Sequence, residues 1–180
     1  MDRGNDPAAV KTTLPAWLRF SLLGAALLLA LALSPLRPLK IEGSSMEPTL
    51  RNGETYVLDQ FYWKLTGLQL GDVVVLERED GDKWVKRLVG MPGDVLQIGR
   101  DELGWIRHIA NVTRHPEQRL SDAYLEERTV QPGEVFIIGD NLNRSSDSTN
   151  QEAGSFKLTD VIGVARTFTM RRSFPFRKHL

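Results

Sequence analysis

GDVVVLEREDGDKWVKRLVG, residues 71–90, contains two runs rich in β-branched and other apolar side chains, separated by a short charged segment. Runs of this kind are typical of β-strands. The Asp80-Gly81 step lies between them, and glycine accepts the positive φ that tight hairpin turns require. We therefore predict two strands, residues 72–77 and 84–89, that are antiparallel neighbours.

The same pattern continues beyond Pro38, where short β-branched and aromatic runs alternate with glycine-containing turns. This is typical of a mainly β domain with antiparallel strands. The pattern weakens into charged sequence between residues 94 and 133, so we expect a short insertion at about 95–133, either an excursion from the main sheet or a surface subdomain. The other candidate strands cover residues 55–58, 95–98, 134–138 and 160–169.

An apolar segment precedes the β region: residues 17–36 read WLRFSLLGAALLLALALSPL. A helix of this length spans about 30 Å, enough for one bilayer crossing, and we interpret it as a transmembrane anchor. A cleaved signal peptide is the competing interpretation, because basic residues precede a short apolar run and Ala30-Leu31-Ala32 resembles a cleavage triplet. A buried core helix is disfavoured, since the segment is apolar on all sides.

The predicted organisation is therefore an N-terminal segment (residues 1–16), an anchor (17–36) and one β-rich domain (37–180), a size that suits a single core. Lysine and arginine flank both ends of the anchor almost equally, so the positive-inside rule gives no orientation.

Composition excludes several classes of function. Lysine plus arginine and aspartate plus glutamate both number 23, so no net charge favours nucleic-acid binding. There is no cysteine, which rules out thiol catalysis and thiolate metal sites. The histidines His108, His115 and His179 match neither a zinc motif nor a Ser-His triad. We expect no metal and no cofactor.

Ser45 begins the run Ser-Met-Glu-Pro-Thr-Leu, directly after a glycine-bearing stretch. By itself this pattern indicates a serine in a turn that Pro48 helps to shape. A serine hydroxyl is a poor nucleophile without a group that takes its proton, and a neutral lysine can serve where no histidine is near.

Lys86 is the candidate for that lysine. Strand alternation places it on the same face as Trp84 and Leu88, where burial would disfavour the ammonium form and lower its pKa. Arg87 would face the other way and stay charged. The alternative is a lysine on an edge strand that extends to solvent.

A dense polar loop, GDNLNRSSDS from Gly139 to Ser148, follows a predicted apolar strand. It could present Ser145 as a hydroxyl partner for the Lys86 amine and Asp147 as a carboxylate partner for Arg87. There are two alternatives: an ordinary turn rich in Asn and Asp, and a calcium loop. The calcium loop is disfavoured, because the spacing lacks the order of ligands found in an EF-hand.

Together these motifs resemble the type I signal peptidases, a family of serine proteases with a Ser-Lys dyad. The family boxes read SMEPTL from Ser45, GDVVVL from Gly71, KRLVGMPGD from Lys86 and GDNLNRSSDS from Gly139, in family order after one hydrophobic segment. The resemblance implies a signal-peptidase-like antiparallel β domain with one N-terminal transmembrane helix. It also implies an endopeptidase that removes signal peptides from exported precursor proteins.

Carried over by position, the resemblance makes Ser45 the nucleophile, Lys86 the general base and Ser145 its orienting partner, with Asp147 and Arg87 as a supporting ion pair. The Ser45 backbone N–H would bind the oxyanion. The implied partners are signal peptides and the lipid bilayer, with no nucleic acid and a monomeric state. The implied location is the plasma (inner) membrane, with a single pass, a cytoplasmic N-terminal segment and an extracytoplasmic catalytic domain.

The chain also departs from the family pattern. Gly43 stands where some relatives carry a serine that completes the oxyanion hole, which leaves the second donor open. Residues 142–144 read Leu-Asn-Arg instead of Arg-Asp-Asn, and Thr149 replaces an arginine, for which Arg144 is a candidate substitute. The insertion is short, so the second β subdomain of larger relatives is expected to be reduced.

Two other functions fit part of the pattern. Another Ser-Lys protease, such as a self-cleaving repressor or a pilus-processing peptidase, shares the dyad chemistry. A catalytically inactive, membrane-tethered binding domain would account for the altered loop and for Thr149.

Overall fold

The computed structural model describes residues 15–121, 123–150 and 156–166, and the chain divides into two units, with the boundary between Ser34 and Pro35. The first unit contains one helix, α1 (Ala16–Ala32), which is rich in leucine and alanine, both strong helix formers. Residues 1–14 of the predicted N-terminal segment lie outside the described part. Within that part, no helix reaches the length and hydrophobicity of a membrane span.

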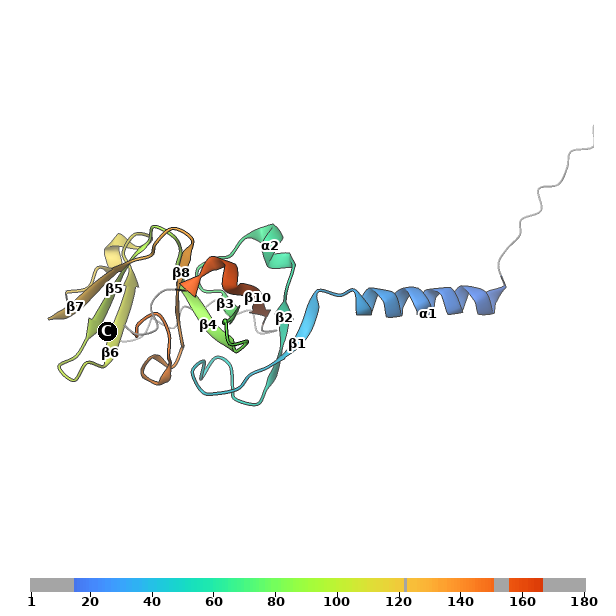
Figure 1. The fold of residues 1–180 in the computed structure, drawn as a ribbon, viewed down its shortest axis with the longest axis horizontal. Helices are drawn as coiled ribbons and strands as arrows, with labels where there is room; N and C mark the ends of the chain where they lie inside the picture. Colours follow the sequence, from blue (N-terminus) through green and yellow to red (C-terminus); the bar gives the residue numbers. More distant parts are fainter. Residues whose placement is uncertain (1–14, 122, 151–155, 167–180) are drawn as a thin grey trace, which may run out of the picture. The chain divides into compact units, whose positions relative to one another are not determined.

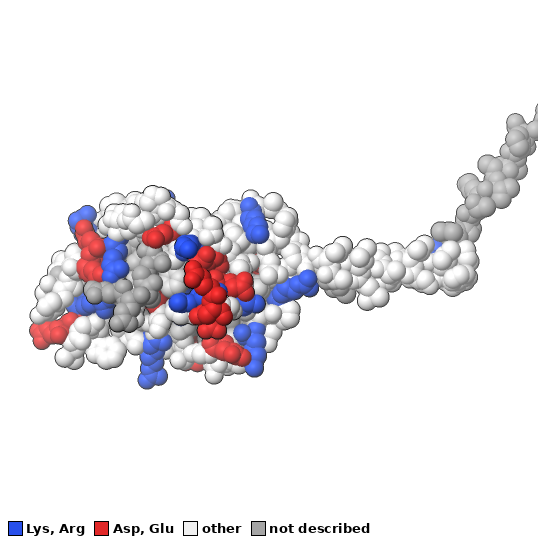
Figure 2. All heavy atoms as spheres, in the orientation of Figure 1, with Lys and Arg blue, Asp and Glu red and all other residues white. Residues whose placement is uncertain are grey.

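The bounds predicted for the apolar helix, residues 17–36, are too long at the C-terminal end. The helix ends at Ala32, and Leu36 is already the first residue of a strand. Pro35 explains the end, because a residue that precedes proline disfavours the helical conformation. Figure 2 shows α1 covered mostly by uncharged atoms, whereas acidic and basic side chains are interspersed over the β-rich unit.

The second unit is mainly β, as predicted, and its larger sheet has seven strands in the order β1-β2-β10-β3-β4-β8-β9 (Figure 1). All neighbouring strands whose register is known are antiparallel. The strands are β1 (Leu36–Lys40), β2 (Thr55–Asp59), β3 (Val73–Glu77), β4 (Lys83–Gly90), β8 (Glu134–Ile138), β9 (Phe156–Lys157) and β10 (Val161–Arg166).

The predicted hairpin is confirmed. β3 and β4 pair antiparallel, with Glu77 opposite Lys83 and Val74 opposite Lys86, and Gly81 in the turn has a φ of 85°. The strands predicted at 55–58, 95–98 and 134–138 are also present within one or two residues. The strand predicted at 160–169 is described as far as Arg166.

The insertion at 95–133 forms a small sheet of its own, in the order β6-β5-β7. Its strands are β5 (Val95–Arg100), β6 (Ile106–Asn111) and β7 (Tyr124–Thr129). Of the two possibilities for this segment, the structure therefore shows a subdomain, which lies next to β8 in Figure 1. The short helices are α2 (Tyr62–Thr66), η1 (Pro116–Gln118), η2 (Leu142–Arg144) and η3 (Leu158–Asp160).

Three clusters of buried apolar side chains hold the unit together. One joins β1, β2 and β3 to the loop after β1, and a second lies among β3, β4, β8 and β10. The third contains Leu96, Ile106 and Phe136, so it packs the small sheet against β8. Because β8 contributes to two clusters, it connects the two sheets.

Candidate active site

Ser45 lies in the loop between β1 and β2, and two buried side chains fix this loop. Met46 and Leu50 are almost fully buried in the cluster beneath the loop, and Leu50 N–H donates a hydrogen bond to Met46 O at 2.9 Å. Burial of two large apolar side chains on either side of a turn stabilises its backbone. Ser45 itself is half-buried, so its hydroxyl is held in place and remains accessible.

Lys86 reaches Ser45 from β4, across 41 residues of sequence. Its Nζ lies 2.9 Å from Ser45 Oγ, within hydrogen-bond distance, and 5.5 Å from the centre of the Trp84 ring. β4 lies between β3 and β8, inside the sheet, so the alternative of an edge-strand lysine is wrong. The structure therefore brings the two predicted residues into direct contact.

The electrostatic setting of Lys86 favours the neutral amine. The residue is only 5% exposed, and this burial lowers its pKa from the ordinary value, while the negative charge of Asp147 opposes the shift. Burial is the larger effect, because an ammonium loses its hydration when it is covered by protein. A neutral amine beside a hydroxyl can take the hydroxyl proton.

A cavity of about 580 Å³ opens over this pair. Its walls are the chain from the end of β1 to the Ser45 loop on one side and the start of β4 on the other, with Ser146 from the polar loop. The apolar residues that line it are Leu39, Ile41, Met46, Trp84 and Val85. Extended backbone on both sides of a groove can accept a peptide in an extended conformation.

The polar loop after β8 contacts the Ser45 loop directly. Asn141 N–H donates to Ser45 O at 2.9 Å, and Asn141 Nδ2 donates to Ser44 O at 3.2 Å. Gly139 is required for this close approach, since a Cβ at this position would meet the Ser145 side chain and lie 2.5 Å from Ser45 O. Asn141 was not predicted, although it belongs to the Gly-Asp-Asn run that carried the resemblance.

Ser145 is placed beside Gly139 and the Ser45 loop. Its Oγ is buried and has no hydrogen-bond partner in the described part of the chain. The structure thus brings Ser145 to the site but shows no hydrogen bond between its hydroxyl and Lys86 Nζ. The predicted role as a partner of the lysine stays a prediction.

The predicted ion pair between Arg87 and Asp147 is wrong, because Arg87 pairs with Asp140. Arg87 Nε lies 2.6 Å from Asp140 Oδ1 and NH2 lies 2.5 Å from Oδ2, and NH1 donates to Gly71 O at 2.7 Å. The strand register explains this choice. Arg87 lies opposite Ile138, and Asp140 follows two residues later on the same face.

Asp147 is fully buried and is held by other donors. It accepts hydrogen bonds from Gly139 N–H at 2.8 Å, from Thr149 N–H at 3.0 Å and from Thr149 Oγ1 at 2.6 Å. Thr149 therefore donates to the carboxylate at the position where the resemblance implied an arginine. Arg144, the candidate substitute, is exposed, and no ion pair between it and Asp147 occurs among the described residues.

Two backbone N–H groups near the Ser45 hydroxyl were candidate oxyanion donors, those of Ser45 and Gly43. No hydrogen bond from Ser45 N–H is found within the described ranges, so this donor is available for a substrate oxygen. Gly43 has a φ of 94°, a conformation that side-chain-bearing residues rarely adopt, and its N–H already donates to Asn52 Oδ1 at 3.0 Å. Gly43 thus offers no second donor in this arrangement.

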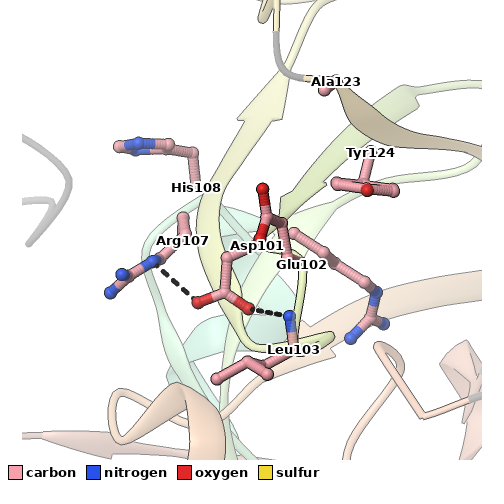
Figure 3. A pocket seen from close by; sticks show the side chains of 8 residues that line it. Asp101, Glu102, Leu103, Arg107, His108, Ala123 and Tyr124 are labelled. Atoms are coloured by element: carbon pink, nitrogen blue, oxygen red, sulfur yellow. Dashed lines mark hydrogen bonds and ion pairs between the residues drawn. The ribbon is translucent and has the colours of Figure 1, made fainter.

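A separate cavity of about 510 Å³ lies at the β5–β6 hairpin (Figure 3). Asp101, one of the residues that line it, pairs with Arg107 at 3.1 Å and accepts a hydrogen bond from Leu103 N–H at 3.0 Å. None of its lining residues is a predicted site residue. The chemistry is therefore concentrated in the groove above Ser45 and Lys86.

Comparison with known proteins agrees with this geometry. The family model described as "Signal peptidase, peptidase S26" matches residues 14–170. Signal peptidase I U of Bacillus subtilis (strain 168) is 32% identical over 150 residues, covering 78% of this chain and 79% of that protein. Signal peptidase I P of Bacillus subtilis subsp. natto is 31% identical over 169 residues, covering 86% and 88%.

Among solved structures, a signal peptidase I from Enterococcus faecalis V583 is similar to 54% of this chain and 95% of its own, with a TM-score of 0.37 and 24% identity. The family assignment rests on the sequence matches, which cover most of both chains. The chain therefore belongs to the signal peptidase family, peptidase S26, and is a serine endopeptidase of that family.

Proposed function

We propose that this protein is a membrane-anchored signal peptidase that removes N-terminal signal peptides from exported precursor proteins, with Ser45 as nucleophile and Lys86 as general base. One observation carries the proposal: a buried lysine whose amine lies 2.9 Å from an accessible serine hydroxyl, in a groove with extended backbone on both sides. The curated relatives that match most of this chain are named signal peptidases I.

The geometry supports a two-step reaction. Lys86 takes the proton of the Ser45 hydroxyl as Oγ attacks the carbonyl carbon of the scissile bond. The oxygen of the tetrahedral intermediate becomes negative, and the Ser45 N–H is placed to donate to it. The Lys86 ammonium then gives its proton to the leaving amine, and the acylated Ser45 remains.

Hydrolysis of the acyl-enzyme repeats the same proton transfers with water. Lys86, neutral again, takes a proton from the attacking water, and the collapse of the second intermediate releases Ser45 and the carboxylate of the signal peptide. Both steps need the neutral lysine, which is the state that its burial favours.

The groove supports selection of a peptide with small side chains. Trp84 and Met46 are large side chains that line it, and small residues are the ones that the A-x-A pattern places before signal-peptide cleavage sites. Precursor signal peptides are thus the proposed partners, and the chain is proposed to act as a monomer.

The proposed anchor is α1, whose apolar side chains are exposed: Trp17 and Phe20 are 69% and 73% exposed. Exposed apolar surface of this extent indicates a membrane or protein partner. Twelve residues separate Ala32, the last residue of α1, from Ser45, at most about 45 Å of extended chain, so an anchor would hold the nucleophile near the bilayer. We place the β-rich unit on the extracytoplasmic side of the plasma membrane, where exported precursors emerge.

The deciding experiment compares purified full-length protein in detergent and lipid with its Ser45→Ala and Lys86→Ala variants on a precursor that carries a signal peptide. Cleavage by the wild type that both variants lose is the expected result. Cleavage that persists in both variants would refute the Ser-Lys assignment. If the wild type does not cleave but binds the precursor, the protein is an inactive binding domain.

A further inference from the structure

The polar loop after β8 is attached to the small sheet at two points. Asn143 makes the first, with two hydrogen bonds to the backbone of Ile106 at the start of β6. Ile106 N–H donates to Asn143 Oδ1 at 3.0 Å, and Asn143 Nδ2 donates to Ile106 O at 3.2 Å. Leu142 packs against the buried cluster that joins the small sheet to β8. The first half of the loop is therefore fixed to β6.

Arg100, the last residue of β5, makes the second attachment. Its NH2 donates to Thr149 O at 2.8 Å, its NH1 donates to Gly104 O at 3.1 Å, and its guanidinium lies 3.6 Å from Glu126 on β7. A planar guanidinium with several partners has little freedom to move. Arg100 therefore fixes the position of Thr149 at the far end of the loop.

Thr149 in turn holds Asp147 with two hydrogen bonds, from its N–H and its hydroxyl. The negative charge of Asp147 acts on Lys86 and raises its pKa. Thr149 binds Asp147 Oδ1, whereas Asp147 Oδ2 accepts a hydrogen bond from Gly139 N–H, beside the Ser45 loop. A continuous series of contacts thus leads from the small sheet to the reacting pair. Arg100 itself contacts neither Ser45 nor Lys86.

We propose that Arg100 is a positioning residue for the Ser45–Lys86 pair, which it aligns through Thr149 and Asp147. The proposal rests on the proposed function and extends it, because it gives the small sheet a part in the reaction. The other charged groups of the groove are Lys40 at the end of β1, Glu42 after it, and Asp82 and Lys83 before Trp84, and none of them contacts Arg100.

The test compares Arg100→Met and Arg100→Lys with Glu126→Gln, a control that removes the ion pairs of Glu126 with Arg100 and Arg128 and leaves the bond from Arg100 to Thr149. For Arg100→Met we expect a fall in kcat of about 10-fold with little change in KM, because displacement of a catalytic group by about 1 Å can cost about 100-fold. Arg100→Lys keeps a donor and should recover part of the rate. The kcat of Glu126→Gln should stay within about twofold of the wild-type value, because partly exposed ion pairs contribute little.

The pH profile separates positioning from general destabilisation. A loosened loop admits water to the Lys86 amine, relieves its burial and raises its pKa, so the acid limb of kcat/KM should move to higher pH in Arg100→Met. A merely structural role would lower the Tm without moving this limb. An unchanged kcat and limb, or an equal loss in Glu126→Gln, would overturn the proposal.

A second measurement does not depend on cleavage. The reactivity of the Lys86 amine toward an acylating reagent, followed by mass spectrometry across pH, reports its pKa in every variant. A shift in Arg100→Met but not in Glu126→Gln supports positioning even if no precursor is cleaved. If neither variant shifts, Arg100 does not act on Lys86, whatever the outcome for the proposed function.

Discussion

Replacement of Asp140 by alanine is expected to lower the free energy of unfolding by about 3–5 kcal/mol, because Arg87 would stay buried without its counter-charge. The Arg87 and Asp140 side chains are 9% and 1% exposed, and both carboxylate oxygens accept from the guanidinium. Arg87 keeps its bond to Gly71 O in the variant, so the loss is that of the charge pair.

The size of this effect can be measured by urea unfolding, followed by tryptophan fluorescence. For a unit of this size, a loss of about 3–5 kcal/mol corresponds to a fall in Tm of about 6–20 °C. The exposed pair of Lys40 and Glu42, 3.8 Å apart, provides the control. Glu42→Ala should cost at most about 1 kcal/mol, because water screens exposed ion pairs.

A double variant tests the cause. Arg87→Met together with Asp140→Leu leaves no charge in the buried position, so it should be more stable than Asp140→Ala. Two results would refute the reasoning: a loss below about 1 kcal/mol in Asp140→Ala, or a double variant that is as unstable as the single one.

Three further predictions concern the loop. Asp147→Asn removes the charge that raises the pKa of Lys86, so the acid limb of kcat/KM against pH should move to lower pH; a move to higher pH would contradict this account. Gly139→Ala should cost about 1–3 kcal/mol through overpacking and reduce cleavage, whereas Gly24→Ala in α1, which meets nothing within 4 Å, should cause no loss of stability in the β-rich unit. Thr149→Val should lose about 1–3 kcal/mol of stability in the same assay, because a buried carboxylate loses a donor, and Thr149→Ser should restore it.

The strands with apolar β-branched runs were predictable, and those with charged exposed faces were not. β6 and β7 read IRHIAN and YLEERT, and most of the β7 side chains are exposed. Such strands form because β5 supplies partners on both edges, which is a property of the fold and not of their own sequence. β1 was missed for another reason: Pro38 argues against a strand, although an edge strand accepts it.

For the candidate site, motif order and strand alternation led to Ser45 and to the buried face of Lys86, and the structure places the two side chains in contact. The sequence did not show which side chains pair with each other across neighbouring strands of the sheet. The partner of Arg87 depends on the register of β4 and β8, which brings Asp140 to it. Arg100 donates to the backbone of Thr149, which lies 49 residues away in the sequence. No sequence motif indicated that these two residues are in contact.

Lys86 and Arg87 are neighbours on β4 and point to opposite faces of the sheet, which has a consequence for folding. A slip of β4 by one residue would exchange them and present to Ser45 a guanidinium that cannot lose its proton at any physiological pH. The bidentate pair with Asp140 disfavours that misaligned sheet, because a lysine in its place could not satisfy both carboxylate oxygens in the same plane. The salt bridge therefore favours the register of β4 in which Lys86, and not Arg87, faces Ser45.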